Sequence, residues 1–349
     1  MLPLTWATLT AGLIIGTLFA MSSHHWLLAW VGLEMTTLSV TPLIYKSHHP
    51  RALEAAIKYF LTQACASILI LFTSMMAAWD TGHWEILSQM HEPTTLMMLL
   101  ALSMKLGVAP THFWFPEVLQ GTTIPTALLL TTWQKIAPIS LLCLMHNSLS
   151  TKALLLLGML SGLLGGIMGL NQTQTRKILA FSSIAHMGWL ILALTISPNL
   201  TLMTMMIYLL MTAAIFLTLI ATSTKTVTDL GLSWSNLPAT HTLTMLAFLS
   251  LAGLPPFSGF LPKWMILEEM IMLNRKTAAT IMILTSLPSL YFYLRLAYLS
   301  TMVLPPTPET TKKSWRQNPK ISWSLSKLLI IALLLLPLMP HIIAAFKAT

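Results

Sequence analysis

Two stretches decide the fold of this 349-residue chain: GVAPTHFWFP at residues 107–116 and GLPPFSGFLP at residues 253–262. Both fit the pattern G-x-x-P-x-x-x-x-x-P, and the second copy follows the first after 146 residues. Proline removes a backbone donor and clashes with the preceding helical turn, and glycine gives the backbone extra freedom. Because both stretches lie inside long apolar segments, we predict two helices broken within a membrane, with an ordinary proline kink as the alternative. The predicted break residues are Gly107, Pro110, Gly253 and Pro256.

Apolar segments fill most of the remaining chain. Hydrophobic residues make up 55% and charged residues 8%, against roughly 25% charged in a soluble domain. Runs of about 18 or more apolar residues recur, and each is long enough to span the hydrocarbon layer of a bilayer. The sequence therefore predicts an all-α integral membrane protein with about eleven transmembrane helices. They are expected at residues 3–21, 25–45, 59–79, 94–118, 123–146, 150–170, 177–196, 200–223, 240–271, 277–300 and 325–345.

The two predicted breaks indicate an internal repeat. They fall in the fourth and ninth helices, so each is the fourth member of a five-helix unit. An odd number of helices per unit inverts the second copy in the membrane, and inverted repeats with broken helices at matching positions are typical of transporters. We predict one membrane domain over residues 1–349, with inverted units at about 1–148 and 150–300 and a C-terminal helix at about 325–345.

The net charge of +9 does not indicate nucleic-acid binding, because the basic residues are scattered between apolar segments and act as loop charges that set orientation. The side that holds the N-terminus carries more lysine and arginine than the opposite side, which places it in the cytoplasm or mitochondrial matrix. The C-terminus is then expected on the other side. The N-terminus does not resemble a transit peptide, so we expect the chain to be made in the compartment that inserts it, a bacterial cell or an organelle with its own genome. The abundance of methionine, 24 residues, favours a mitochondrial genetic code.

Five ionisable residues lie near the centres of the predicted spans: Glu34, Lys105, Lys135, His186 and Lys263. A charge at the bilayer centre costs at least roughly 2.5–3.5 kcal/mol, so such residues mark functional sites. Three lysines cannot all pair with one glutamate inside the chain, which favours groups that gain and lose protons. Burial disfavours a charged ammonium group and a nearby carboxylate favours it, so moving the carboxylate would switch a lysine between its two states.

Purely structural roles are the alternatives to this proton relay. Glu34 could belong to a static ion pair with one lysine, and His186 could be a hydrogen-bonded packing residue. The two cysteines form no CxxC motif, so neither an iron–sulfur cluster nor a zinc site is expected. Glycine-rich nucleotide motifs are also missing from the sequence. We therefore expect no cofactor and no metal in this chain.

Five segments carry a family resemblance: residues 22–44, 47–67, 106–118, 171–189 and 251–264, which include VGLEMTTLS, EAAIKYFLTQA, GVAPTHFWFP, KILAFSSIAHMGW and GLPPFSGFLPKW. In both identity and spacing they resemble the subunit 2 family of mitochondrial NADH–ubiquinone oxidoreductase, respiratory complex I. Subunits of this family are similar to cation–proton antiporters and lie in the membrane arm of the complex.

The resemblance implies a core subunit of an enzyme that oxidises NADH, reduces ubiquinone and pumps protons across the mitochondrial inner membrane. It implies that Glu34 modulates Lys105, that Lys135 relays protons along the membrane centre, and that Lys263 lies towards the exit. NADH, FMN, iron–sulfur clusters and ubiquinone are expected in other subunits. The expected partners are other membrane-arm subunits, accessory subunits and lipids such as cardiolipin. A stand-alone cation–proton antiporter and an inert membrane scaffold are the alternatives.

Overall fold

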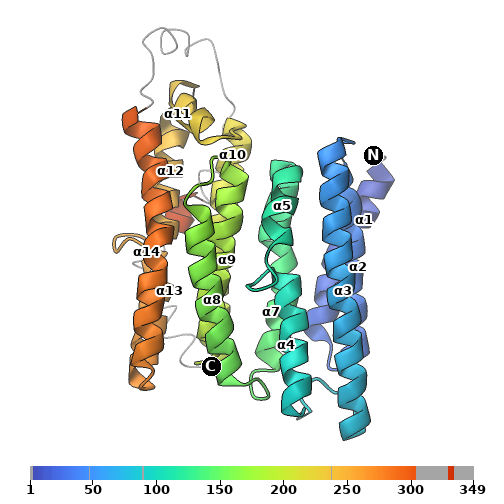
Figure 1. The fold of residues 1–349 in the computed structure, drawn as a ribbon. Coiled ribbons are helices and arrows are strands. Elements are labelled where there is room, and N and C mark those ends of the chain that lie inside the picture. Colours follow the sequence, from blue (N-terminus) through green and yellow to red (C-terminus); the bar gives the residue numbers. More distant parts are fainter. Residues whose placement is uncertain (1–2, 47, 89, 237, 304–328, 334–349) are drawn as a thin grey trace. The chain divides into compact units, whose positions relative to one another are not determined.

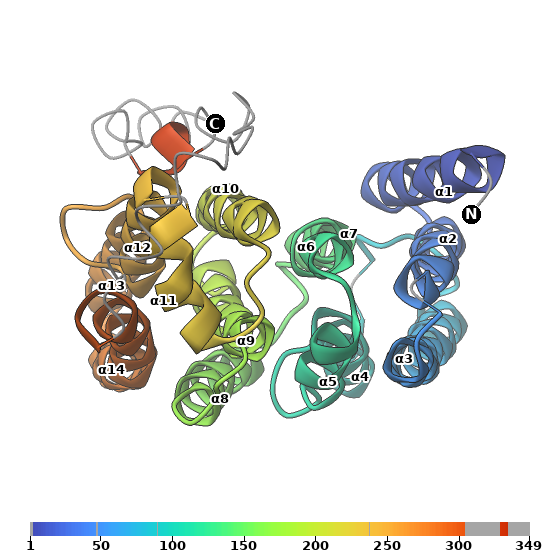
Figure 2. The ribbon, with the colours of Figure 1, turned by 90° about the horizontal axis from the view of Figure 1, so that it is seen from above.

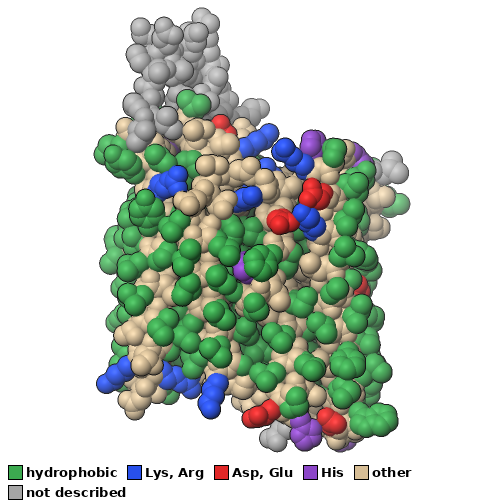
Figure 3. All heavy atoms as spheres, in the orientation of Figure 1, with side chains coloured by type: hydrophobic (Ala, Val, Ile, Leu, Met, Phe, Trp, Pro, Cys, Tyr) green, Lys and Arg blue, Asp and Glu red, His purple; other side chains and the backbone are tan. Residues whose placement is uncertain are grey.

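The structure is a computed structural model that describes residues 3–46, 48–88, 90–236, 238–303 and 329–333. The described residues form helices and two isolated backbone bridges, without any β-strand. The chain divides into two compact units, Met1–Ser161 and Gly162–Thr349 (Figure 1). In each unit hydrophobic side chains cover the middle of the helices, and charged side chains gather near the helix ends (Figure 3). The predicted all-α membrane fold is therefore confirmed.

The first unit is a bundle in which α2 lies between α1 and α3 (Figure 2). Close packing of α1 on α2 depends on small residues, because a Cβ atom on Gly16 would lie 2.8 Å from the carbonyl oxygen of Gly32. The later helices of the unit pack against this row. The helices are α1 (Pro3–Ser22), α2 (Trp26–Tyr45), α3 (Pro50–Thr81), α4 (Glu92–Leu106), α5 (Trp114–Gly121), α6 (Ile124–Thr131), α7 (Trp133–Leu144) and the start of α8 (Thr151–Gly169).

The second unit packs α9 and α10 against two further helices, α12 and α13, and closes with α14. Gly165 on α8 lies against the backbone of α9, where a Cβ atom would meet the amide nitrogen of Ala185 at 2.6 Å. The helices are α9 (Thr175–Leu194), α10 (Pro198–Thr222), α11 (Val227–Asn236), α12 (Pro238–Ala252), α13 (Phe260–Met272), α14 (Lys276–Tyr298) and a π-helical turn, η1 (Leu299–Val303).

Among the described residues, eight helical segments are long and apolar enough to cross a membrane in one piece. They match the predicted first to third, fifth to eighth and tenth spans. The predicted fourth and ninth spans are the two that are broken, into α4 and α5 and into α12 and α13. The predicted eleventh span, 325–345, lies outside the described residues apart from residues 329–333, which are helical.

Some predicted boundaries were wrong. Helix α3 begins at Pro50, nine residues before the predicted start, and Nδ1 of His49 caps its first turn by accepting from the amide of Arg51. The predicted fifth span is interrupted at Thr132, where the backbone departs from α-helical angles, with φ −110° and ψ −71°.

Helix α11 was not predicted, because it is too short and too polar to be recognised as a membrane span. Its start is fixed by two reciprocal bonds. The hydroxyl of Thr226 accepts from the amide of Asp229 at 3.2 Å, and the carboxylate of Asp229 accepts from the amide of Thr226 at 2.9 Å. This is a capping box, with the spacing T-x-x-D. The spacing is visible in the sequence and was the signal that could have revealed this helix.

Candidate functional site

The two predicted breaks end their helices in the same backbone turn. Gly107 and Gly253 both adopt left-handed φ angles, 70° and 84°. The amide of each glycine donates to the carbonyl three residues earlier, and the next amide donates to the carbonyl five residues earlier, at 3.0–3.5 Å. This pair of bonds is a Schellman cap, which favours glycine because a side chain is strained at positive φ. The repeated sequence pattern therefore produces a repeated structure.

Beside the first break lies an internal chamber of the first unit. It is lined from α2, α3, α4, α5, α6 and α7, and both Lys105 and Lys135 belong to its wall. The two lysines are only 7% and 2% exposed. The space open to the centre of a water molecule is about 10 Å³, which is close to the minimum that a single water needs. The chamber thus brings two buried ammonium groups to one small polar space.

Glu34 acts electrostatically on Lys105, but the two side chains are not bonded to each other. Among the described residues, neither Nζ of Lys105 nor the buried Oε2 of Glu34 has a hydrogen-bond partner. Their interaction is coulombic, and Glu34 also acts on Tyr59 of α3. The arrangement differs from the closed, hydrogen-bonded ion pair that a static structural role requires.

Lys135 lies over an aromatic ring on the other side of the same chamber. Its Nζ is 5.0 Å from the ring centroid of Phe115 on α5, within the range in which a cation is attracted to a ring face. The preceding residue, Gln134, donates from Nε2 to the carbonyl oxygen of Thr36 at 3.4 Å and so ties α7 to α2. The position of Lys135 therefore depends on α5 and α2 together.

The second unit holds a separate chamber beside the second break. His186, Tyr208 and Lys263 contribute to its wall, and its space for water centres is about 30 Å³. Nζ of Lys263 donates to the carbonyl oxygen of Ala252, the last residue of α12, at 2.9 Å. The rings of His186 and Tyr208 lie 5.7 Å apart between centroids. Among the described residues that line this chamber, none is acidic.

The five predicted residues thus fall into two groups. Lys105 and Lys135 line the first chamber, and His186 and Lys263 line the second. Glu34 does not line either chamber, and it joins the first group only through its charge, which acts on Lys105. Sequence reasoning missed the neutral polar groups of both chambers. In the first, these are Tyr59, Gln63 and Gln134, and in the second, Tyr208 and Thr204. For Tyr59 and Gln63 a signal was available in the sequence: their i, i+4 spacing places them on one face of an apolar helix.

Comparison with known proteins places this arrangement in a family. Residues 23–289 match the model described as NADH:quinone oxidoreductase/Mrp antiporter, TM, and residues 290–343 match NADH dehydrogenase subunit 2 C-terminus. The chain belongs to the NADH:quinone oxidoreductase/Mrp antiporter family. NADH-ubiquinone oxidoreductase chain 2 of Gallus gallus is 52% identical over 96% of each chain. The same chain of Struthio camelus is 50% identical over 95% of this chain and 96% of its own.

Solved structures of the family have the same fold. A chain of respiratory complex I from Thermus thermophilus superposes with a TM-score of 0.81 at 28% identity, covering 95% of this chain and 78% of that one. A chain of the Mrp complex from Dietzia sp. DQ12-45-1b gives a TM-score of 0.77 at 20% identity, over 88% and 61% of the two chains. The second likeness concerns the fold alone. The resemblance seen in the sequence is therefore confirmed.

Proposed function

We propose that this chain is a membrane-arm subunit of a proton-translocating NADH:ubiquinone oxidoreductase. Protons cross it through a relay of Glu34, Lys105, Lys135, His186 and Lys263. The observation that carries the proposal is the placement of three lysines at two chambers: Lys105 and Lys135 are buried at the first, and the half-buried Lys263 lines the second. Two of the three, Lys105 and Lys263, lie beside broken helices. Family membership and the names of the relatives support the same function.

The geometry suggests how the first chamber handles a proton. Lys105 is buried and carries no hydrogen bond among the described residues, and the charge of Glu34 acts on it against the effect of burial. When the carboxylate moves away or is protonated, the charged ammonium loses support and Lys105 releases its proton. Lys135 borders the same chamber, and in its neutral amine form it is the proposed acceptor of this proton. Glu34 thus acts as the switch, and the two lysines act as donor and acceptor.

The second chamber would receive and release the proton under a different influence. Lys263 donates to the carboxyl end of α12, where the helix dipole favours a positive charge. His186 borders the same space and can accept or donate a proton at either ring nitrogen. Lys263 would therefore hold its proton as long as the broken helix keeps its shape.

The energy for this transfer would come from partners, because the redox chemistry is proposed to lie elsewhere. NADH, FMN, iron–sulfur clusters and ubiquinone would bind to other subunits of the enzyme. We infer lateral contacts with other membrane-arm subunits and accessory subunits, and with lipids such as cardiolipin. The location would be the mitochondrial inner membrane, with the N-terminus in the matrix and the C-terminus in the intermembrane space. The relatives and the multi-pass helical fold support the membrane location. The proposed orientation of the termini rests on the distribution of lysine and arginine between the loops.

A stand-alone cation–proton antiporter is the alternative that the sequence left open, and the NADH-ubiquinone oxidoreductase relatives do not favour it. Cation binding would need carboxylates around the site, whereas lysines border both chambers here. A native gel of mild-detergent extracts separates the two functions. Migration with a very large band that oxidises NADH supports the oxidoreductase subunit, and migration as a small free oligomer supports the antiporter.

Lys105→Ala then tests the relay in the assembled enzyme. The change removes the buried ammonium group, so we expect proton pumping to be nearly abolished and electron transfer to slow. The measurement is the number of protons pumped per electron in inner-membrane vesicles, with the amount of assembled enzyme determined on the same gel. A normal proton-to-electron ratio in this variant would rule out the relay and favour an inert scaffold.

A further inference from the structure

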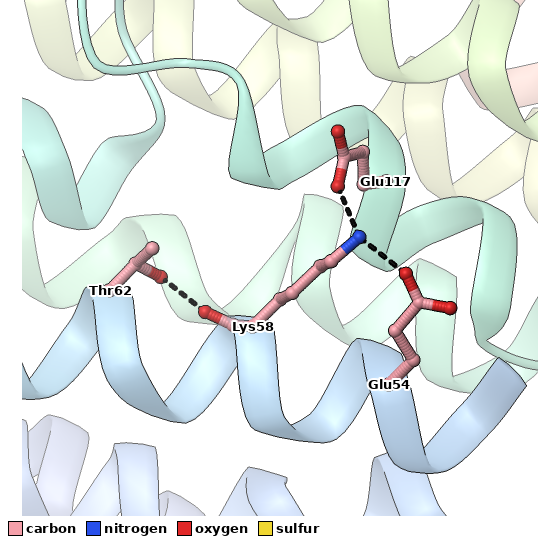
Figure 4. A network of polar contacts seen from close by, with 4 residues as sticks. All are labelled: Glu54, Lys58, Thr62 and Glu117. Carbon is pink, nitrogen blue, oxygen red and sulfur yellow. Dashed lines mark hydrogen bonds and ion pairs between the residues drawn. The ribbon is translucent and has the colours of Figure 1, made fainter. Parts of the chain in front are cut away.

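A three-residue ionic cluster joins α3 to α5 outside the two chambers. Nζ of Lys58 donates to Glu54 at 2.5 Å and to Glu117 at 2.6 Å (Figure 4). Glu54 lies one turn earlier on the same helix, α3, and Glu117 lies on α5, 59 residues further along the chain. Only the contact with Glu117 therefore links two separate elements.

The position of α5 depends on such contacts with its neighbours. It has eight residues and no side-chain cap at its start, and an isolated helix of this length is not stable. At its far end, Gly121 lies directly on the backbone of α3, where a Cβ atom would be 2.6 Å from the carbonyl oxygen of Arg51. The bond between Lys58 and Glu117 fastens the middle of α5 to the same helix.

Helix α5 in turn contributes Trp114 and Phe115 to the wall of the first chamber, which Lys105 and Lys135 also line. The indole nitrogen of Trp114 donates to the carbonyl oxygen of Met104 at 3.2 Å, next to Lys105. The next residue, Phe115, carries the ring that lies 5.0 Å from Nζ of Lys135. A shift of α5 would therefore change the surroundings of both lysines at once.

The repeat gives independent support. Glu117 lies ten residues after Gly107, and Lys263 lies ten residues after Gly253. In the second unit this position fastens the second half of the broken helix, because Lys263 on α13 donates to Ala252 at the end of α12. In the first unit the same position fastens α5, through Lys58. Corresponding positions thus hold the second half-helix in both copies.

We propose that the bond between Lys58 and Glu117 clamps α5 against α3 and so positions Trp114 and Phe115 around the proton relay. Lys58 and Glu117 are positioning residues, whereas Glu54 is a neighbour that does not link the two helices. The inference rests on the proposed relay. The three side chains are 39%, 53% and 62% exposed, and exposed ion pairs change an equilibrium by a factor of about two to five.

The test compares two carboxylates that contact the same lysine. Glu117→Gln, Glu54→Gln, Lys58→Met and Lys58→Arg are introduced separately, and protons pumped per electron are measured in inner-membrane vesicles with the assembled enzyme. We expect Glu117→Gln and Lys58→Met to lower the ratio about two- to fivefold. Glu54→Gln and Lys58→Arg should stay near the wild type, because both keep the link between the helices. The double variant Lys58→Met/Glu117→Gln should be no worse than either single variant.

Equal loss in Glu54→Gln and Glu117→Gln would overturn the clamp, since charge alone would then explain the effect. Additive losses in the double variant, or no loss in any variant, would also overturn it. If Glu117→Gln does not assemble, the clamp is tested by comparing the protons pumped per electron in Lys58→Met and Lys58→Arg. Lys105→Ala is measured in the same experiment. Normal pumping in Lys105→Ala would reject the relay itself. Loss of pumping in Lys105→Ala with normal pumping in Glu117→Gln would reject only the clamp.

Discussion

The two broken helices end in the same turn, but different donors close them. At the end of α4, a neutral indole from Trp114 donates to the carbonyl oxygen of Met104. At the end of α12, the ammonium group of Lys263 donates to the carbonyl oxygen of Ala252. Lys105, two residues before the first break, is left without a hydrogen bond among the described residues and under the influence of Glu34.

This difference indicates two ways of controlling a buried lysine. In the first unit the control is a side-chain carboxylate, which can rotate, move with its helix or take up a proton. In the second unit it is a backbone carbonyl at a helix end, which changes only when the break changes shape. Under the proposed relay, the first chamber would respond to movement of a side chain, and the second to a change in backbone shape.

Among the variants that compare the two units, Glu34→Gln should lower the rate of proton pumping most. The change removes the carboxylate that acts on Lys105 and leaves the donor–acceptor pair of Lys263 intact. A factor of ten corresponds to roughly 1.4 kcal/mol, and two unit charges 4 Å apart interact by about 4 kcal/mol at an effective dielectric constant of 20. We therefore expect the pumping rate to fall at least about tenfold.

The control for Glu34→Gln is Glu268→Gln, which removes an exposed carboxylate of α13 that does not line the second chamber. Vesicle acidification followed with a pH-sensitive dye measures both variants. Similar losses of pumping in Glu34→Gln and Glu268→Gln would mean that pumping depends on total charge. The proposed difference between the two units would then be wrong.

Alanine at the two break glycines should give a smaller, graded effect. Both substitutions are strained by positive φ, at a cost of about 1–2 kcal/mol. At Gly253 the new Cβ atom would also lie 3.0 Å from Nζ of Lys263, whereas at Gly107 it would meet Cβ of Phe115 at 3.2 Å. Gly253→Ala should therefore displace the lysine itself.

We expect both glycine variants to reduce the amount of assembled enzyme to a similar degree, as read on a native gel. Protons pumped per electron should fall further, about two- to fivefold, in Gly253→Ala than in Gly107→Ala. Equal ratios in the two variants would show that Lys263 does not depend on the shape of its break.

Pro256→Ala should have the smallest effect. From the sequence, loss of this proline is expected to straighten the broken helix. In the structure, α12 already ends at Ala252, and the left-handed Gly253 with its Schellman bonds completes the cap before Pro256 is reached. We therefore expect pumping and assembly within about a factor of two of the wild type, because the cap alone stops the helix. A large loss of pumping with normal assembly would restore the proline as the cause of the break.

Much of this fold follows from the sequence because it depends on local rules. Apolar runs fix where helices can cross a membrane, and the repeated G-x-x-P pattern predicts both breaks at the residues where the helices end. Apolar runs did not predict the short polar helix α11 or the interruption of the fifth span at Thr132. The cost of burying charge is equally local, and it singles out five residues as functional: Glu34, Lys105, Lys135, His186 and Lys263.

The sequence by itself determined which residues are buried and ionisable and where the helices break, since both depend on composition and on backbone chemistry near one residue. Only the tertiary structure decided which groups meet. It placed Lys105 and Lys135 in one chamber, brought Lys263 to the end of α12, and joined Lys58 to Glu117 across 59 residues. These contacts depend on how helices distant in sequence pack, and the direction of a side chain across such an interface is not encoded in any one segment.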